Sequence, residues 1–441
     1  MTIQEYIRDH ALDAMRIAGR RVGAGRERSI AVFNPYTGQP IGSVPKATLD
    51  EVREAYATAH ACQPKLTRFE RAAILNKAAA LISQRLDEVA RLITAEAGLC
   101  LKDALYEAGR VSDVLLFGAS EVLKDDGQIF SCDLTHHGKK RRVYTQRSPL
   151  LGVITAITPF NHPMNQVAHK VVPSIATNNR MVLKPSEKVP FSAILFADIL
   201  YEAGLPSEML SVITGDPREI ADELITNEHV DLVTFTGGVA IGKYIASKAG
   251  YRRMVLELGG NDPIIVMEDA DLDEASTLAV QGSYKNSGQR CTAVKRILVV
   301  EKVADAFVER VLAKAKKLKA GDPLDPETQM GPLISKAQHD KVLSYIGVGR
   351  QEGATLACGG NVPSLQGFSG GFFVEPTVFT DVTDTMRIAR EEIFGPVMSV
   401  LKFSDEDEVV ERANATEFGL AAGVFTRDLA RAHRVIGRSE E

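Results

Sequence analysis

Apolar residues recur at helical spacing in the first quarter of the chain. Within residues 68–95 they lie three and four positions apart, and Thr67 with Glu70 forms a capping-box pattern directly before this run. The spacing predicts one long helix over 68–95 and a second helix from 101 to about 123. Arg110 lies among the apolar positions of the second helix, where it is either solvated or directed into a site.

From 128 to 147 the pattern changes to short segments of mixed polarity. Residues 130–134 and 142–145 have the composition of strands, and a turn at 138–140 separates them. This predicts an exposed β-hairpin, which is either an arm for subunit contact or a surface flap.

From 150 onward, short unbroken apolar runs alternate with amphipathic segments. Strands of a parallel sheet that is covered on both faces have such runs, and the alternation predicts βαβ units. The predicted strands are 152–157, 180–184, 210–214 and 231–234, and the predicted helices between them are 164–176, 192–203 and 218–226.

A second alternation begins with a strand at 263–266. It continues with a helix at 272–284, a strand at 297–300 and a helix at 303–319. We therefore expect an α/β fold with two domains and a boundary near Leu258-Gly259-Gly260.

The composition narrows the class of protein. The chain has 441 residues, 45% hydrophobic and 25% charged, as is typical of a soluble globular enzyme. A net charge of -5 without a basic tract argues against nucleic acid and acidic membrane surfaces as partners. The N-terminus lacks the apolar core of a signal peptide, and no apolar run approaches the roughly 20 residues that span a bilayer. Five scattered cysteines favour a reducing, cytoplasmic location and show no metal-ligand spacing.

Two strand ends in the first domain have the residues of a dinucleotide site. Residues 233–242 run from a strand through Gly237-Gly238 into a helix, which presents backbone N–H groups to a phosphate; a purely structural turn has the same pattern. Lys184 and Glu187 follow another strand. A carboxylate there accepts ribose hydroxyls and repels a 2′-phosphate, so the pair favours NAD over NADP.

Asn161 and Glu257 also follow strands. Two prolines hold the turn around Asn161, whose amide is either a turn former or an oxyanion donor. Glu257 precedes a double glycine in an apolar strand. A carboxylate buried there would have a raised pKa suited to a general base, or would form a buried salt bridge.

Cys291 lies in the loop 286–292, directly after Arg290. The thiolate is the reactive form of cysteine, and a neighbouring cation lowers the thiol pKa. A small residue buried in the core is the alternative interpretation. Residues 391–397 join two acids to an aromatic residue and a Gly-Pro turn, and a packing corner has the same composition.

Together these segments resemble the NAD(P)-dependent aldehyde dehydrogenase superfamily, from residues 34–38 to 426–429, with six motifs in the same order. The resemblance implies an aldehyde dehydrogenase-like fold. Residues 1–127 and 148–258 would form a Rossmann-type NAD-binding domain, 128–147 an oligomerisation hairpin and 259–441 a catalytic domain. The implied assembly is a homodimer or homotetramer.

The resemblance also implies roles for individual residues. Cys291 would attack the aldehyde carbon, Asn161 with the backbone N–H of Cys291 would hold the oxyanion, and Glu257 would activate the water that hydrolyses the thioester. The residues implied to bind NAD are Thr158, Pro159, Lys184, Ser186, Glu187, Thr236, Gly237, Gly238, Gly242, Leu258, Glu392 and Phe394.

Residues 288–296 narrow the resemblance to members that oxidise small phosphorylated or phosphonylated aldehydes, and phosphonoacetaldehyde is the nearest likeness. Arg110, His162 and Arg290, with Thr292, form the expected substrate clamp, because guanidiniums make forked contacts to a phosphonate. A non-phosphorylating glyceraldehyde-3-phosphate dehydrogenase is the alternative; that enzyme usually prefers NADP, which Glu187 disfavours.

The resemblance implies several tens of residues after Glu441, including part of the substrate tunnel and a strand that pairs with a partner's hairpin. A truncated C-terminal end is therefore expected. Two further alternatives stay open: transfer of the acyl group to coenzyme A, and a catalytically idle binding or structural relative. Gly238 stands where many members have serine, so the pyrophosphate would lose one hydroxyl contact.

Overall fold

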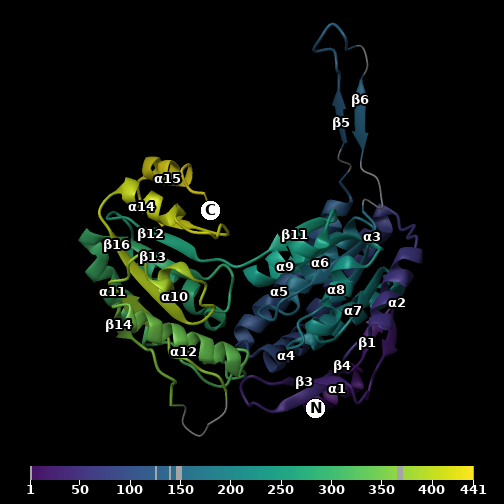
Figure 1. The fold of residues 1–441 in the computed structure, drawn as a ribbon, viewed down its shortest axis with the longest axis horizontal. Coiled ribbons are helices and arrows are strands. Elements are labelled where there is room, and N and C mark those ends of the chain that lie inside the picture. Colours follow the sequence, from purple (N-terminus) through teal and green to yellow (C-terminus); the bar gives the residue numbers. More distant parts are fainter. Residues whose placement is uncertain (1, 125–126, 139–140, 146–150, 365–370, 441) are drawn as a thin grey trace. The chain divides into compact units, whose positions relative to one another are not determined.

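The computed structural model describes residues 2–124, 127–138, 141–145, 151–364 and 371–440 (Figure 1). The chain divides into two compact units. The first contains Met1–Val32, Pro40–Ile93 and Leu105–Glu257, and the second contains Phe33–Gln39, Thr94–Ala104 and Leu258–Glu441. Residues 33–39 and 94–104, which we assigned to the cofactor domain from the sequence, thus cluster with the second unit.

A seven-stranded sheet forms the centre of the first unit, in the order β11-β10-β7-β8-β9-β1-β2. Its parallel strands are β7 (Val153–Ile157), β8 (Arg180–Lys184), β9 (Leu210–Val212), β10 (Val230–Thr236) and β11 (Arg253–Glu257). The antiparallel strands β1 (Met15–Ile17) and β2 (Arg20–Val22) complete it. The chain runs from β7 through β8 to β9 and then crosses to β10 on the other side of β7. In such sheets the strands that flank this switch point bind ligands at their carboxyl ends.

The helices of the first unit confirm the predicted βαβ rhythm. α6 (Asn165–Ala176), α7 (Pro190–Ala203), α8 (Pro217–Thr226) and α9 (Val239–Ala249) connect the parallel strands. The remaining helices are α1 (Ile3–Asp9), α2 (Leu49–Ala61), α3 (Arg68–Gln84), α4 (Leu86–Ala97) and α5 (Leu101–Val122). The capping box of Thr67 and Glu70 is present. The single helix predicted over 68–95 is wrong, because Arg85 leaves helical dihedral angles and separates α3 from α4.

The predicted hairpin is a two-stranded antiparallel sheet of β5 (Gly127–Phe130) and β6 (Arg142–Thr145) (Figure 1). Its first strand begins earlier than the predicted 130–134. Residues 139–140 of the predicted turn and 146–147 of the hairpin lie outside the described residues. The side chains of Ile129, Phe130, Val143 and Tyr144 are exposed. A second small sheet pairs β3 (Ser29–Phe33) with β4 (Pro40–Pro45).

A six-stranded sheet forms the centre of the second unit, in the order β14-β15-β16-β13-β12-β17. Its strands are β12 (Asp262–Val266), β13 (Val294–Val300), β14 (Thr355–Cys358), β15 (Thr377–Thr380), β16 (Val397–Phe403) and β17 (Gly423–Phe425). The neighbours β12, β13 and β16 are parallel, so their amino ends meet at one edge of the sheet.

Two clusters of buried apolar side chains pack within this unit. Its helices are α10 (Leu272–Tyr284), α11 (Glu301–Ala315), α12 (Lys336–Gln351), α13 (Arg387–Arg390), α14 (Glu406–Asn414) and α15 (Leu429–Ile436). In the described part of the chain, we find no helix with the length and apolar character to cross a membrane and no group of three or more metal-ligating side chains.

Candidate active site

The switch point of the first sheet has unused polar groups. Thr158 follows β7 and Thr236 ends β10, and the register pairs Ile157 with Phe235 just before them. Both threonine hydroxyls are buried, and neither has a hydrogen-bond partner in the described part of the structure. α9 begins directly after Gly238, and no side chain caps it. Free hydroxyls and uncapped N–H groups at this edge suit a pyrophosphate.

The two glycines of this turn differ. A Cβ at Gly237 would collide with the ring of Phe235, so the turn requires glycine there. A Cβ at Gly238 would meet no atom within 4 Å, so the backbone does not require glycine. Gly242 is buried within α9.

Lys184, the last residue of β8, lies on the strand next to β7. It is 3% exposed, and its Nζ donates to Pro185 O at 3.1 Å and to Glu187 Oε2 at 3.3 Å. Burial lowers the pKa of Lys184, while Glu187 raises it. Ser186 Oγ accepts the backbone N–H of Lys188 at 3.3 Å. A fixed cation and a partly exposed carboxylate at this strand end fit the adenosine ribose of NAD.

The loop that carries Asn161 is held by Glu107, a residue that the sequence interpretation missed. Asn161 is 4% exposed. The Glu107 side chain is 1% exposed; its Oε2 lies 3.1 Å from His162 Nδ1. Its Oε1 accepts the backbone N–H groups of Met164 at 3.0 Å and Asn165 at 3.1 Å. One buried carboxylate therefore orients the imidazole and binds the start of α6.

A signal for Glu107 existed in the sequence. It lies on α5 among the buried residues Ala104, Ala108 and Val111. A carboxylate on an apolar helix face requires partners, because burying an unpaired charge is unfavourable.

Glu257 does not lie where we expected. It ends β11, an edge strand, and is exposed, so the expected burial in an apolar strand is wrong. Its charge acts on two residues of α6. It raises the pKa of Lys170, which burial lowers to about 8, and that of His169, which burial and Arg110 lower. Lys170 Nζ donates to Thr234 Oγ1 at 2.9 Å.

The second unit builds its part of the site at the amino ends of three neighbouring strands. Cys291 precedes β13, Gly259-Gly260 precedes β12, and Glu392 precedes β16. A Cβ at Gly260 would collide with the carbonyl oxygen of Cys291. The Gly260 N–H donates to Glu392 Oε1 at 3.2 Å. The double glycine is required because three backbones and a carboxylate approach closely here.

The loop before Cys291 has an unusual backbone. Asn286, Ser287 and Gly288 have φ angles of 52°, 53° and 71°. Side-chain bonds hold this loop: Ser287 Oγ donates to Gly331 O at 2.6 Å, and Gln289 Oε1 accepts the Ile334 N–H at 3.0 Å. Non-glycine residues in the left-handed region are strained, and such strain is common at functional loops.

The loop of Glu392 has the same feature. Phe394 has a φ of 58°, and its carbonyl accepts Gln338 Nε2 at 2.8 Å. The carboxyl of Glu392 has a raised pKa because it is buried.

The thiol of Cys291 is not activated in the way we expected. Burial raises its pKa above the ordinary value, and the carboxylates of Asp262 and Glu392 add to this. Backbone N–H groups of Thr292 and Cys291 itself lower it. Arg290 is not among the causes; its Nη2 donates to Thr292 Oγ1 at 3.3 Å. The expected lowering of the thiol pKa is therefore wrong.

The predicted residues fall in both units. The first contains Asn161, Glu257, Arg110 and His162 with Thr158, Pro159, Lys184, Ser186, Glu187, Thr236, Gly237, Gly238 and Gly242. The second contains Cys291, Arg290 and Thr292 with Leu258, Glu392 and Phe394.

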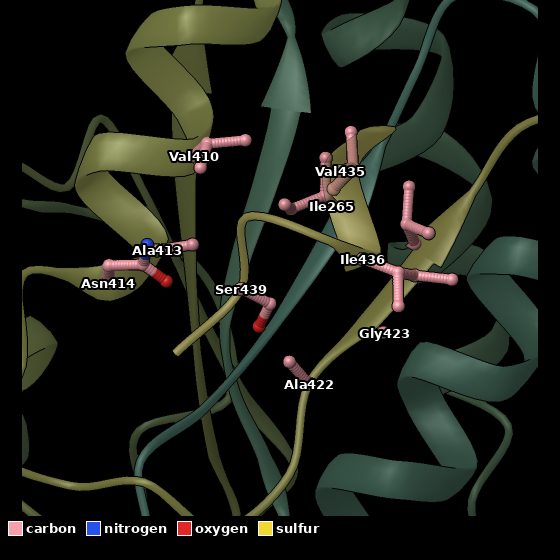
Figure 2. A pocket seen from close by; sticks show the side chains of 10 residues that line it. Ile265, Val410, Ala413, Asn414, Ala422, Gly423, Val435, Ile436 and Ser439 are labelled. Carbon is pink, nitrogen blue, oxygen red and sulfur yellow. The ribbon is translucent and has the colours of Figure 1, made fainter. Parts of the chain in front are cut away.

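A separate pocket of about 150 Å³ lies in the second unit (Figure 2). Ile265 of β12, Val410 of α14 and Val435 of α15 project into it. Its lining is apolar apart from Asn414 and Ser439, so it offers shape and no acid–base chemistry.

Comparison with known proteins decides the family. The model of the aldehyde dehydrogenase family matches residues 22–440. The chain belongs to this family. A betaine aldehyde dehydrogenase of Mesorhizobium japonicum is 47% identical over 95% of this chain and 86% of the relative. One from Brucella anthropi is 44% identical over 92% and 83%.

Solved structures confirm the aldehyde dehydrogenase fold. An NAD-dependent aldehyde dehydrogenase from Sinorhizobium meliloti has a TM-score of 0.91, with 36% identity over 97% of this chain and 86% of that one. A betaine aldehyde dehydrogenase from Staphylococcus aureus in complex with NAD+ has a TM-score of 0.93, with 32% identity over 100% and 88%. The predicted superfamily is thus confirmed, while the names of these relatives do not support phosphonoacetaldehyde as a substrate.

Proposed function

We propose that this aldehyde dehydrogenase oxidises an aldehyde to the carboxylic acid through a thioester on Cys291. The observation that carries the proposal is the convergence of three loops on this thiol at the amino ends of β12, β13 and β16, with backbone N–H groups bonded to it. Cysteine is the family's nucleophile in the resemblance, and its thiolate attacks carbonyl carbon readily.

In the proposed reaction the Cys291 sulfur loses its proton and forms a bond to the carbonyl carbon. The Asn161 amide and the Cys291 backbone N–H stabilise the oxyanion that results. The oxyanion then re-forms the carbonyl as the C–H bond breaks, which leaves a thioester. Glu257 takes a proton from water, the hydroxide attacks the thioester carbon, and the C–S bond breaks to release acid and thiolate.

NAD is the proposed cofactor and, when bound, accepts the electron pair of the broken C–H bond. The switch-point hydroxyls of Thr158 and Thr236 and the start of α9 would hold its pyrophosphate, and Lys184 with Glu187 its adenosine ribose. Glu392 and Phe394 of the second unit would hold its nicotinamide end. The ratio of kcat/KM with NAD to that with NADP tests this assignment, and Glu187→Gln should lower the ratio.

For the substrate we propose a small anionic aldehyde, with phosphonoacetaldehyde as the first candidate. Three observations support it. The imidazole of His162 is paired with a buried carboxylate, Arg110 contributes positive charge near α6, and Arg290 neighbours the nucleophile. These groups would bind a phosphonate as a clamp.

The clamp is tested by Arg290→Ala, assayed on phosphonoacetaldehyde and on an uncharged aldehyde of similar size. A larger loss of kcat/KM for the anion supports the clamp. Equal losses on both substrates would remove it.

Betaine aldehyde is the second candidate, because relatives at 43–47% identity bear that name. Its quaternary ammonium is a cation, which aromatic faces bind and guanidiniums repel. A kcat/KM panel of phosphonoacetaldehyde, betaine aldehyde, glyceraldehyde-3-phosphate and a neutral aldehyde separates these readings. Adding coenzyme A to the same assay tests acyl transfer. No NADH from any aldehyde would favour an idle relative.

A homodimer or homotetramer is also proposed. The exposed apolar side chains of the β5–β6 hairpin, and Met254 and Val255 on the edge strand β11, support it, because exposed apolar edges favour association. Light scattering after gel filtration measures the oligomer directly.

A further inference from the structure

Lys295 is a buried cation to which neither the sequence nor the proposed reaction assigns a role. It lies on β13, four residues after Cys291, and is 3% exposed. Its Nζ donates to Gly288 O at 3.1 Å and to Gly395 O at 2.7 Å. Gly288 belongs to the nucleophile loop (286–292), and Gly395 to the cofactor loop (392–395). One ammonium therefore joins the two loops.

The backbones of these loops also touch. A Cβ at Gly288 would collide with the carbonyl oxygen and carbon of Gly395. Two carbonyl groups thus face the same small space. Carbonyl dipoles that converge in a buried space repel each other unless a donor lies between them, and the Lys295 ammonium supplies that donor.

The surroundings of Lys295 balance its charge. Glu392 and Asp262 favour the ammonium, whereas Arg290 and burial oppose it. Glu392 itself accepts the Gly260 N–H, so the same carboxylate links the cofactor loop to the segment packed on Cys291.

We propose that Lys295 is a positioning residue that fixes the nucleophile loop against the cofactor loop. The proposal rests on the proposed function, in which the first loop carries the attacking thiol and the second carries Glu392 and Phe394. Breaking the C–H bond requires the substrate on Cys291 and the cofactor at a set distance, and a misplacement of about 1 Å can cost on the order of 10²-fold in rate.

The test compares Lys295→Met with Lys314→Met. Lys314 is a matched control in the same unit: its Nζ contacts Asp273, Ser276 and Thr277 on α10, away from both loops. Hydrogen exchange is measured for peptides covering 286–292 and 392–397. We expect Lys295→Met to speed exchange in both peptides together, and Lys314→Met to leave both unchanged.

Kinetics give the second readout. For Lys295→Met we expect kcat to fall about 10²-fold and KM for NAD to rise, while the thermal midpoint falls no further than in the control. Lys295→Gln, which retains a shorter amide donor, should recover part of kcat. It also serves in place of Lys295→Met if that variant does not fold.

The two readouts separate failure of this inference from failure of the proposed function. A wild-type enzyme that forms no NADH from any aldehyde refutes the function, and exchange alone then decides whether Lys295 joins the loops. Unchanged exchange in both peptides, exchange that rises throughout the unit, or an unchanged kcat overturns the positioning role.

Discussion

The two units use opposite ends of their parallel strands. The first gathers its groups at the carboxyl ends of β7, β8 and β10, next to the uncapped start of α9. The second gathers them at the amino ends of β12, β13 and β16. The carboxyl edge therefore offers N–H groups and free hydroxyls, which suit an anion.

The amino edge has the opposite polarity. Carbonyls of Gly288 and Gly395 and the carboxylates of Asp262 and Glu392 surround the site. This explains why the pKa of Cys291 is raised, although helix N-termini elsewhere lower thiol pKa values. It also explains why a buried lysine is needed at this edge.

The two buried lysines of these edges differ accordingly. Lys170, in the first unit, donates to one side chain and senses the charge of Glu257, and burial lowers its pKa to about 8. Lys295 donates to two backbone carbonyls of different loops, and burial lowers its pKa to about 7. Lys170 thus acts on a charged side chain, and Lys295 on the position of loops.

The largest effect should come from the amino edge. Cys291→Ala should lower kcat by at least about 10³-fold, because the nucleophile is removed. Binding of NAD, measured by calorimetry, should stay within about twofold. Cys62→Ala, which removes another half-buried thiol, is the control and should keep full activity. An active Cys291→Ala enzyme would refute the assigned nucleophile.

The next largest effect should come from the oxyanion donor of the carboxyl edge. Asn161→Ala should lower kcat by about 10²–10³-fold with little change in KM, because the amide acts on charge that develops during the reaction. Steady-state NADH formation measures both constants. A rise in KM at unchanged kcat would instead show that Asn161 only binds the substrate.

A smaller effect tests the charge of the first unit. Glu107→Gln keeps an oxygen for the N–H groups of Met164 and Asn165 but removes the negative charge beside His162. We expect kcat/KM to fall about tenfold for phosphonoacetaldehyde and to change little for a neutral aldehyde, because the hydrogen bond to a charged group is lost. Glu51→Gln, in the capping box of α2, is the control. Equal losses on both substrates would mean that Glu107 only shapes the loop.

The smallest effect concerns stability. The pKa of Lys295 is lowered from 10.5 to about 7, so between these values the unfolded chain binds the proton more tightly than the folded chain. The stability of the wild type relative to Lys295→Met should therefore rise with pH above 7, by at most about 1.4 kcal/mol per unit. Asp262, Glu392 and Arg290 are the charged groups that act on it. Urea unfolding at pH 7, 8 and 9 measures this, and a difference that falls with pH contradicts the burial of the ammonium.

The sequence predicted most of the fold because periodicity is local. Strands β8 and β12 and helices α5 and α10 lie within a few residues of their predicted bounds. The break at Arg85 was missed, since apolar spacing continues across it. Segments 33–39 and 94–104 were misplaced because contacts distant in sequence, such as Leu101 N–H to Pro323 O at 2.8 Å, attach them to the second unit.

For the site, motifs located the candidate residues but not their environments. The exposure of Glu257 depends on the strand order, which puts β11 at an edge. The raised pKa of Cys291 depends on Asp262 and Glu392, which are 29 and 101 residues from Cys291 in sequence. Glu107 and Lys295 were missed because their partners, His162 and Gly395, become neighbours only in the folded chain.

The most direct test of the central claim uses Glu257→Gln with NAD and the best aldehyde of the panel. We expect a burst of one NADH per active site and then slow turnover, because the thioester forms but its hydrolysis lacks a base. Mass spectrometry of the quenched enzyme should find the acyl group on Cys291. A burst with the acyl group on another cysteine, or steady turnover at the wild-type rate, would contradict the account.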